Sequence, residues 1–132
     1  TMNPTIRIEH LALYVNDLEA ARAFFTKYFN AVSGEKYHNK NTGFCSYFLS
    51  FSDGSRLELM TKPGLHDVQQ DPDRTGYIHL AFSLGSRAAV DALTETMKQD
   101  GCQVISGPRT TGDGYYESCL VGFEGNLIEL TE

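Results

Sequence analysis

The stretch IEHLALYVNDLEAARAFF (residues 8–25) has a counterpart later in the chain, YIHLAFSLGSRAAVDAL (residues 77–93). Each stretch begins with a strand-like apolar pattern, passes through a short turn and continues with apolar residues at helical spacing. His10 and His79 occupy the same place in the two stretches, 69 residues apart. Repetition of this kind indicates one structural unit that is used twice.

A second pair of motifs lies downstream of the first. DGSRLELM (residues 53–60) matches EGNLIELT (residues 124–131), which places Glu58 and Glu129 71 residues apart. Because both pairs give nearly the same spacing, we predict a single domain, residues 1–132, built from two copies of one module. The modules span about residues 6–61 and 77–132, and the Pro-, Gly- and Asp-rich segment 62–76 is the linker between them.

Each module is predicted to contain a strand, a helix and three further strands, which gives an α+β fold of two tandem βαβββ modules. Asp17 can cap a helix over residues 17–29, and Ser86 a helix over residues 87–99 that Gly101 ends. Strands are expected at residues 8–15, 32–38, 44–51 and 55–61, and at residues 77–84, 102–106, 115–121 and 126–131.

The alternation of side chains along these strands predicts which residues face the helices. In the first strand the apolar residues Leu11, Leu13 and Val15 share one face, and His10 lies on the other. The same rule places His79, Glu58 and Glu129 on the face away from the helices. We expect this face to be the concave side of a curved mixed sheet around a central cleft.

If the two modules lie edge to edge, His10, Glu58, His79 and Glu129 approach a common centre. Two carboxylates in a partly buried cleft are costly unless a positive charge offsets them. One divalent metal ion offers that charge, and two imidazoles and two carboxylates leave two octahedral positions for water or substrate. Any one of these residues alone is more often structural, but their matched recurrence predicts a metal site. Ni, Zn, Co, Mn and Fe all suit such ligands.

The composition argues against several other functions. The net charge is −6 and no cluster of Lys and Arg is present, which disfavours nucleic acid as a partner. No apolar run approaches the roughly 18 residues that a membrane span requires. Three cysteines, none spaced as CxxC, indicate reduced thiols in a cytoplasmic protein. Exposed sheet edges favour a homodimer.

Five stretches together resemble the vicinal oxygen chelate superfamily, the glyoxalase/bleomycin resistance/dioxygenase group, over nearly the whole chain. They are IEHLALYVNDLEAARAFFTKYF, DGSRLELM, GYIHLAFSLG, GPRTTGDGYYES and FEGNLIELTE. The resemblance implies a glyoxalase I-like member in which His10, Glu58, His79 and Glu129 are the four metal ligands. It also implies that Glu129 is the catalytic base, a role that Glu58 can share. Related dioxygenases and fosfomycin-modifying enzymes typically use two histidines and one glutamate.

The activity expected from this resemblance is that of a metal-dependent lyase or isomerase, similar to lactoylglutathione lyase. It would act on a small hydroxycarbonyl or thiol-adduct substrate through a metal-bound enediolate. Glutathione-using members commonly have Arg where this chain has Tyr14, and Asn where it has Lys62, so another thiol can take the place of glutathione. Tyr14, Lys62, Arg109 and Tyr116 are the predicted substrate contacts.

Two alternatives remain open at this stage. The chain can be a non-catalytic protein that sequesters a small aromatic or antibiotic-like ligand in the same cleft, or another metal-dependent member such as a dioxygenase or an epimerase. Aromatic side chains that could line such a cleft are Phe44, Tyr47, Phe48, Phe51 and Tyr116. Stoichiometric metal favours the enzyme, whereas a metal-free protein that binds dye-like ligands favours sequestration.

Overall fold

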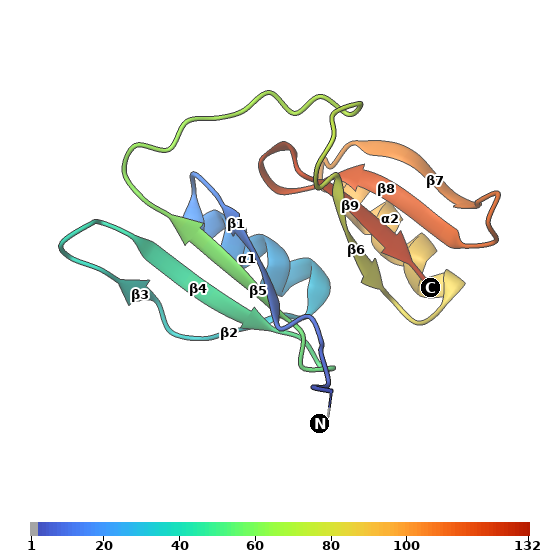
Figure 1. The fold of residues 1–132 in the computed structure, drawn as a ribbon. Coiled ribbons are helices and arrows are strands. Elements are labelled where there is room, and N and C mark those ends of the chain that lie inside the picture. Colours follow the sequence, from blue (N-terminus) through green and yellow to red (C-terminus); the bar gives the residue numbers. More distant parts are fainter. Residues whose placement is uncertain (1–2) are drawn as a thin grey trace. The chain divides into compact units, whose positions relative to one another are not determined.

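The computed structural model describes residues 3–132. The chain forms two compact units, and the boundary between them along the chain falls between Asp67 and Val68. This boundary lies within the predicted linker. Each unit repeats the same order of elements, a strand, a helix and then further strands in one sheet (Figure 1). The predicted α+β class and the tandem βαβββ modules are therefore confirmed, while a common cleft between the sheets stays a prediction.

The first module forms one sheet with the order β1-β5-β4-β2, and β3 pairs with β4. β1 runs parallel to β5, and the other pairs are antiparallel. The elements are β1 (His10–Tyr14), α1 (Leu18–Phe29), β2 (Val32–Ser33), β3 (Tyr37–His38), β4 (Cys45–Ser50) and β5 (Arg56–Thr61).

The predicted strand 32–38 is wrong in one respect, because it is two short strands, β2 and β3. The Gly34 N–H still donates to the Phe48 carbonyl at 2.9 Å, but residues 35–36 leave the ladder. Glycine weakens a strand because it adds conformational freedom and has no side chain to pack. The break lies beside β4, and Phe48, which accepts the Gly34 hydrogen bond, pairs directly with Glu58 of β5.

The second module forms a sheet with the order β6-β9-β8-β7, in which β6 and β9 are parallel. The elements are β6 (His79–Ser83), α2 (Arg87–Gln99), β7 (Val104–Thr110), β8 (Tyr116–Val121), the 3-10 turn η1 (Phe123–Gly125) and β9 (Leu127–Thr131). No helix among residues 3–132 is both long and apolar enough to cross a membrane.

β7 continues beyond the predicted end at residue 106 and reaches Thr110, so Arg109 lies within a strand. Its pairing with β8 shifts register twice. Gly107 has φ +77°, and a Cβ there would lie 2.4 Å from the Glu117 carbonyl oxygen, so only glycine permits this approach. Pro108 is tolerated because β7 is an edge strand.

Both helices begin at the predicted caps. The Asp17 carboxylate accepts a hydrogen bond from the Ala20 N–H at 3.0 Å, and the Ser86 hydroxyl accepts one from the Ala89 N–H at 3.1 Å. These side chains satisfy amide groups that the first helical turn leaves without a partner. The caps fix where each helix starts, and therefore which helical face meets the sheet.

Each helix covers one face of its own sheet with apolar side chains. In the first module the buried residues are Val15, Leu18, Ala21, Phe25, Phe29, Ala31, Tyr47, Leu49, Leu57 and Leu59. In the second they are Val90, Met97, Leu120, Ile128 and Leu130, together with Thr94 and Ser118. Leu11, predicted to face the helix, is 36% exposed, because β1 is an edge strand.

Tyr47 ties α1 to the first sheet through its hydroxyl group. The side chain is buried, and the hydroxyl donates to the Glu19 carboxylate, 2.5 Å from Oε1 and 2.8 Å from Oε2. The Arg22 guanidinium lies 4.7 Å from the centre of the Tyr47 ring. The hydrogen bond to Glu19, together with burial, raises the pKa of Tyr47 above its usual value.

We predict that Tyr47→Phe lowers the free energy of unfolding by about 1–2 kcal/mol at pH 7, because a hydrogen bond to a charged group is lost. A raised pKa in the folded state means that this contribution is fully present below the unfolded tyrosine pKa, about 10. The contribution is lost as pH rises through the folded value. Urea denaturation of both proteins at pH 7 and pH 11 measures the difference.

The exposed Tyr115 offers the matched control, because Tyr115→Phe removes the same hydroxyl group from the surface. This variant is expected to unfold like the wild type at both pH values. A Tyr47→Phe protein that is as stable as the wild type at pH 7 would contradict the assigned role.

Candidate functional site

The first module places His10 and Glu58 side by side on the sheet face opposite α1. In the parallel register, His10 pairs with Arg56 and Ala12 pairs with Glu58, so the histidine and the glutamate are diagonal neighbours on neighbouring strands. His10 Nε2 lies 3.7 Å from Glu58 Oε1, and the two side chains are 37% and 17% exposed. The neighbouring residues Leu57 and Leu59 are buried on the other face, as predicted.

The second module repeats this arrangement. His79 pairs with Leu127, and Ala81 pairs with Glu129, which is the same diagonal register. His79 Nε2 lies 3.4 Å from Glu129 Oε2, and these side chains are 36% and 18% exposed. The predicted face for both histidines and both glutamates is therefore correct within each module.

The two pairs fit the donor set that a divalent metal requires. Two donor atoms that bind one ion at about 2.1 Å and at right angles to each other lie about 3 Å apart. The nitrogen–oxygen distances of 3.7 Å and 3.4 Å in the two pairs would therefore have to shorten only slightly. Among residues 3–132, no group of three or more His, Cys, Asp and Glu side chains is gathered to hold a metal. Each module brings two candidate donors together by itself, and the four-ligand site stays a prediction.

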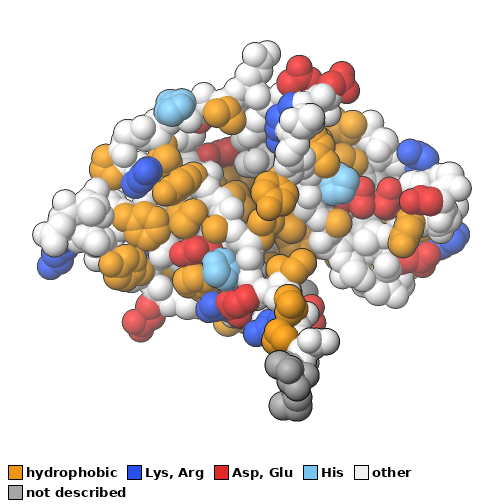
Figure 2. Space-filling view, in the orientation of Figure 1, with side chains coloured by type: hydrophobic (Ala, Val, Ile, Leu, Met, Phe, Trp, Pro, Cys, Tyr) orange, Lys and Arg blue, Asp and Glu red, His pale blue; other side chains and the backbone are white. Residues whose placement is uncertain are grey.

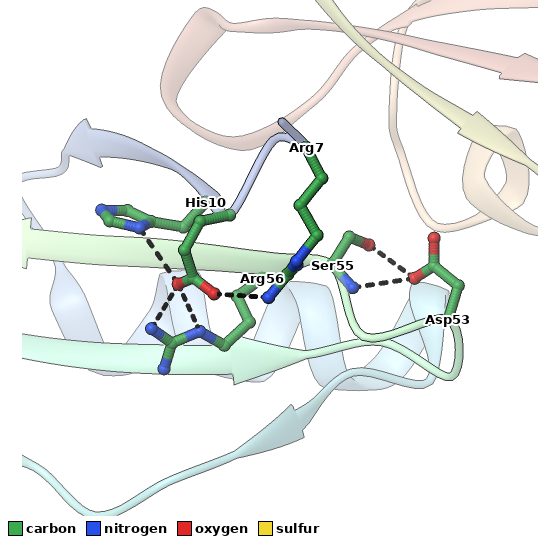
Figure 3. A network of polar contacts seen from close by, with 6 residues as sticks. Arg7, His10, Asp53, Ser55 and Arg56 are labelled. Atoms are coloured by element: carbon green, nitrogen blue, oxygen red, sulfur yellow. Dashed lines mark hydrogen bonds and ion pairs between the residues drawn. The ribbon is translucent and has the colours of Figure 1, made fainter. Parts of the chain in front are cut away.

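A carboxylate that sequence reasoning did not identify contacts His10 on its other ring nitrogen. His10 Nδ1 lies 3.3 Å from Glu9 Oε1, and Glu9 also accepts hydrogen bonds from Arg56 and Arg7 (Figure 3). The hydrogen bond from Arg56 lowers the pKa of Glu9. The repeat could not reveal Glu9, because Ile78 occupies the matching position before His79.

A second carboxylate missed by sequence reasoning lies beside Glu129. Glu117 on β8 shares a hydrogen bond with Glu129, and burial, this hydrogen bond and the neighbouring negative charges raise the pKa of Glu117. Acidic side chains gather on the sheet face of this module in Figure 2. Alternation along β8 could have placed Glu117 on this face, but its repeat counterpart is Ser46, so the duplicated pattern gave no signal.

Cys119 lies opposite Glu129 in the β8–β9 ladder. Burial raises the pKa of its thiol, and the charges of Glu129 and Glu117 raise it further. The thiolate is the nucleophilic form of cysteine, so these surroundings disfavour covalent catalysis by Cys119 at neutral pH.

Two predicted substrate contacts, Tyr14 and Lys62, come together in the first module. The Lys62 Nζ atom lies 5.3 Å from the centre of the Tyr14 ring, a cation–π distance, and Tyr14 is 46% exposed. Tyr14 lies four residues after His10 on β1 and therefore shares its face.

Arg109 and Tyr116, the other two predicted contacts, lie on different faces of the second sheet. Arg109 pairs directly with Glu117, which places it on the face that carries Glu129. The Tyr116 hydroxyl donates to Asp91 of α2, and the Arg87 guanidinium lies 4.9 Å from the Tyr116 ring. The structure therefore does not bring Tyr116 to the face of Glu129.

The aromatic residues that were candidates for a ligand-binding wall also divide between two faces. Tyr47 is buried against α1, as described above. The Phe48 ring instead meets the His10 ring edge-on, with centres 5.4 Å apart. Of these two, only Phe48 can therefore contact a ligand near His10.

The two βαβββ modules, each with a paired histidine and glutamate, define the class to which this protein belongs. The family model described as glyoxalase/bleomycin resistance protein/dioxygenase superfamily matches residues 7–130. The chain therefore belongs to this superfamily, which includes metal-dependent enzymes.

Individual proteins agree with this assignment. The chain is 32% identical to the uncharacterized protein PA2024 of Pseudomonas aeruginosa, over 98% of this chain and 89% of that protein. Its fold resembles the trypanothione-dependent glyoxalase I of Leishmania major, with a TM-score of 0.77 and 21% identity over 97% and 87% of the two chains. It also resembles a mutant of the fosfomycin resistance protein FosX of Listeria monocytogenes, solved with Mn(II) and a dihydroxypropylphosphonic acid. That comparison gives a TM-score of 0.69 and 24% identity over 95% and 90% of the chains.

Proposed function

We propose that this protein is a metal-dependent lyase or isomerase of the glyoxalase I type, acting on a small hydroxycarbonyl or thiol-adduct substrate. One observation carries the proposal. Each module brings an imidazole nitrogen and a carboxylate oxygen to 3.7 Å or 3.4 Å of each other, in the same register and on the face opposite its helix. Membership of a superfamily that contains metal-dependent enzymes supports the same conclusion.

In this proposal His10, Glu58, His79 and Glu129 hold one divalent ion, with Ni, Zn, Co, Mn and Fe as the candidates. Two carboxylates balance the charge of the ion, and two neutral imidazoles complete the protein ligands. When bound, the ion supplies Lewis acidity, which stabilises negative charge that develops on a substrate carbonyl oxygen.

Glu129 acts as the base in the proposed reaction. Its carboxylate accepts a proton from the carbon beside the carbonyl group and returns that proton to the neighbouring carbon. The hydrogen bond that Glu129 shares with Glu117 helps to hold the Glu129 carboxylate in place between these two transfers. Glu58 can share the proton transfer, because its side chain has the equivalent position in the first module.

The substrate is held by side chains on the same faces. Tyr14 offers an aromatic surface, Lys62 beside it offers a positive charge, and Arg109 offers a second one. A flexible ammonium group binds an anionic group as a point charge and lacks the planar fork of guanidinium. The Tyr14–Lys62 pair therefore favours a small anionic thiol adduct other than that of glutathione.

We also propose that the protein works as a cytoplasmic homodimer. β1 and β6 are each a terminal strand of their sheet, so each has a strand edge that can pair with another module. Such pairing can join modules of one chain or of two chains. The odd number of cysteines, none spaced as CxxC, supports a reducing compartment.

Metal analysis followed by activity assays tests this function. We expect about one divalent ion per chain by inductively coupled plasma mass spectrometry. We further expect metal-dependent turnover of methylglyoxal with at least one member of a panel of thiols, and loss of that turnover with a chelator. A protein without metal that binds aromatic dyes and turns over no thiol adduct would instead support sequestration. Cleavage of catechols would support a dioxygenase.

A further inference from the structure

His10 is contacted on both ring nitrogens by carboxylates of its own module. Nε2 faces Glu58 at 3.7 Å, and Nδ1 faces Glu9 at 3.3 Å. A neutral imidazole carries one N–H group, and the other nitrogen keeps a lone pair. If the N–H group is on Nδ1 and donates to Glu9, the lone pair of Nε2 is directed to the side where Glu58 lies.

Glu9 is itself held in place by two arginines. Arg56 donates to Glu9 Oε1 from Nε at 2.9 Å and from Nη2 at 2.5 Å, and Arg7 Nη2 donates to Oε2 at 3.3 Å (Figure 3). Arg56 lies directly opposite His10 in the β1–β5 register. The strand pairing thus places the Arg56 guanidinium next to His10, where it holds the Glu9 carboxylate.

Phe48 completes the surroundings of the imidazole. The Arg56 guanidinium lies 4.1 Å from the centre of the Phe48 ring, and this ring meets the His10 ring edge-on. The ring of His10 is therefore contacted by an aromatic side chain and by a carboxylate at each nitrogen. These contacts favour one orientation of the ring and define the surroundings of each nitrogen.

The second module has no such arrangement. Ile78 precedes His79 where Glu9 precedes His10, and Leu127 lies opposite His79 where Arg56 lies opposite His10. A βαβββ module therefore folds without this carboxylate and this arginine. Their presence in one module alone points to a role at His10 rather than in the fold.

We propose that Glu9 is a positioning residue that keeps His10 in the Nδ1–H tautomer, so that Nε2 is offered as a metal donor. The inference rests on the proposed function of His10 as a metal ligand. Histidines that bind metal commonly donate their other N–H group to a carboxylate, and removal of such a partner typically weakens metal binding by about 10- to 100-fold. Arg56 supports this role because it holds Glu9 at the required position.

Nuclear magnetic resonance of the metal-free, full-length protein tests the tautomer directly. Long-range ¹H–¹⁵N correlation spectra at about pH 8.5, where neutral imidazole predominates in proteins, distinguish Nδ1–H from Nε2–H, and His10→Ala assigns the signals. We expect the Nδ1–H pattern for His10 in the wild type and a shift toward Nε2–H in Glu9→Ala. Glu9→Gln keeps an acceptor oxygen and is expected to restore the wild-type pattern. His79 is the internal reference and should not change.

Zinc titration by calorimetry provides the second measurement. We expect Glu9→Ala to weaken Zn²⁺ binding by about 10- to 100-fold, and Glu9→Gln to weaken it by less than about tenfold. Glu35→Ala is the matched control, because it removes the same charge from an exposed position and should bind Zn²⁺ like the wild type.

The two measurements separate the possible failures. An Nε2–H pattern for His10 in the wild type, or an unchanged pattern in Glu9→Ala, overturns the role of Glu9 whether or not the protein binds zinc. A wild type that binds neither zinc nor any other of the five candidate ions contradicts the proposed function, and with it the donor role of His10, even if the tautomer follows Glu9. A shifted tautomer with zinc affinity equal to the wild type also overturns the inference.

Discussion

The double variant His10→Ala, His79→Ala is expected to lose stoichiometric metal binding, with an affinity weakened by more than about 1,000-fold. A four-ligand zinc site is worth about 10–16 kcal/mol, and this variant removes two of the four proposed donors. The remaining carboxylates, Glu58 and Glu129, lie in different modules and lack the nitrogen donors that favour Zn, Ni and Co. Metal content after dialysis and zinc calorimetry measure the loss.

The control for this prediction is the double variant His38→Ala, His66→Ala. It removes the same two groups from exposed positions outside the repeated motifs. We expect full metal content from the control. Both variants should unfold in urea like the wild type, because all four histidines are at least partly exposed. If the first variant retains about one ion per chain, the proposed ligand set is wrong.

The variant Glu129→Gln is expected to lower kcat by about 10²- to 10⁴-fold while it retains most of its metal. Glutamine keeps an oxygen donor of similar geometry but cannot accept the substrate proton. Metal binding is therefore expected to persist in this variant while catalysis is lost. The loss of kcat corresponds to about 3–5 kcal/mol of transition-state stabilisation. Metal content and steady-state kinetics on the same preparation test the separation.

Glu58→Gln is the matched comparison, because Glu58 has the same place in the first module. If Glu129 is the principal base, Glu58→Gln lowers kcat much less. The opposite order would assign the base to Glu58. Wild-type turnover in Glu129→Gln would remove Glu129 from the reaction.

Much of the fold could be predicted from the sequence, because the repeated signals are local. Asp17 and Ser86 cap their helices as expected, since a capping side chain acts within one turn. Side chains alternate between the two faces along β5 and β9. Glu58 and Glu129 therefore lie on one face of their strands, and the buried leucine and isoleucine side chains lie on the other face. The break at Gly34 and the extension of β7 to Thr110 were not predicted, because they depend on pairing with other strands.

The candidate site was predictable to the extent that both modules share it. His10, Glu58, His79 and Glu129 recur, so the repeat reveals them. Glu9 and Glu117 each occur in one module only, so the repeat does not reveal them, although alternation along β8 places Glu117 on the face of Glu129. Tyr116 is predicted as a substrate contact, but it lies on the same face of β8 as the buried Ser118 and Leu120, which directs its side chain to α2.

The diagonal register of β1 with β5, and of β6 with β9, restricts how this chain can vary in length. Insertion or deletion of one residue within β5 or β9 would turn its glutamate inward and its leucines toward water, because side chains alternate between the two faces. The turns that follow Phe51 and Thr110 connect neighbouring strands, and a change in their length does not alter which face a strand residue occupies. Homologues are therefore expected to gain and lose residues at these turns, while the spacing between paired strand positions is preserved.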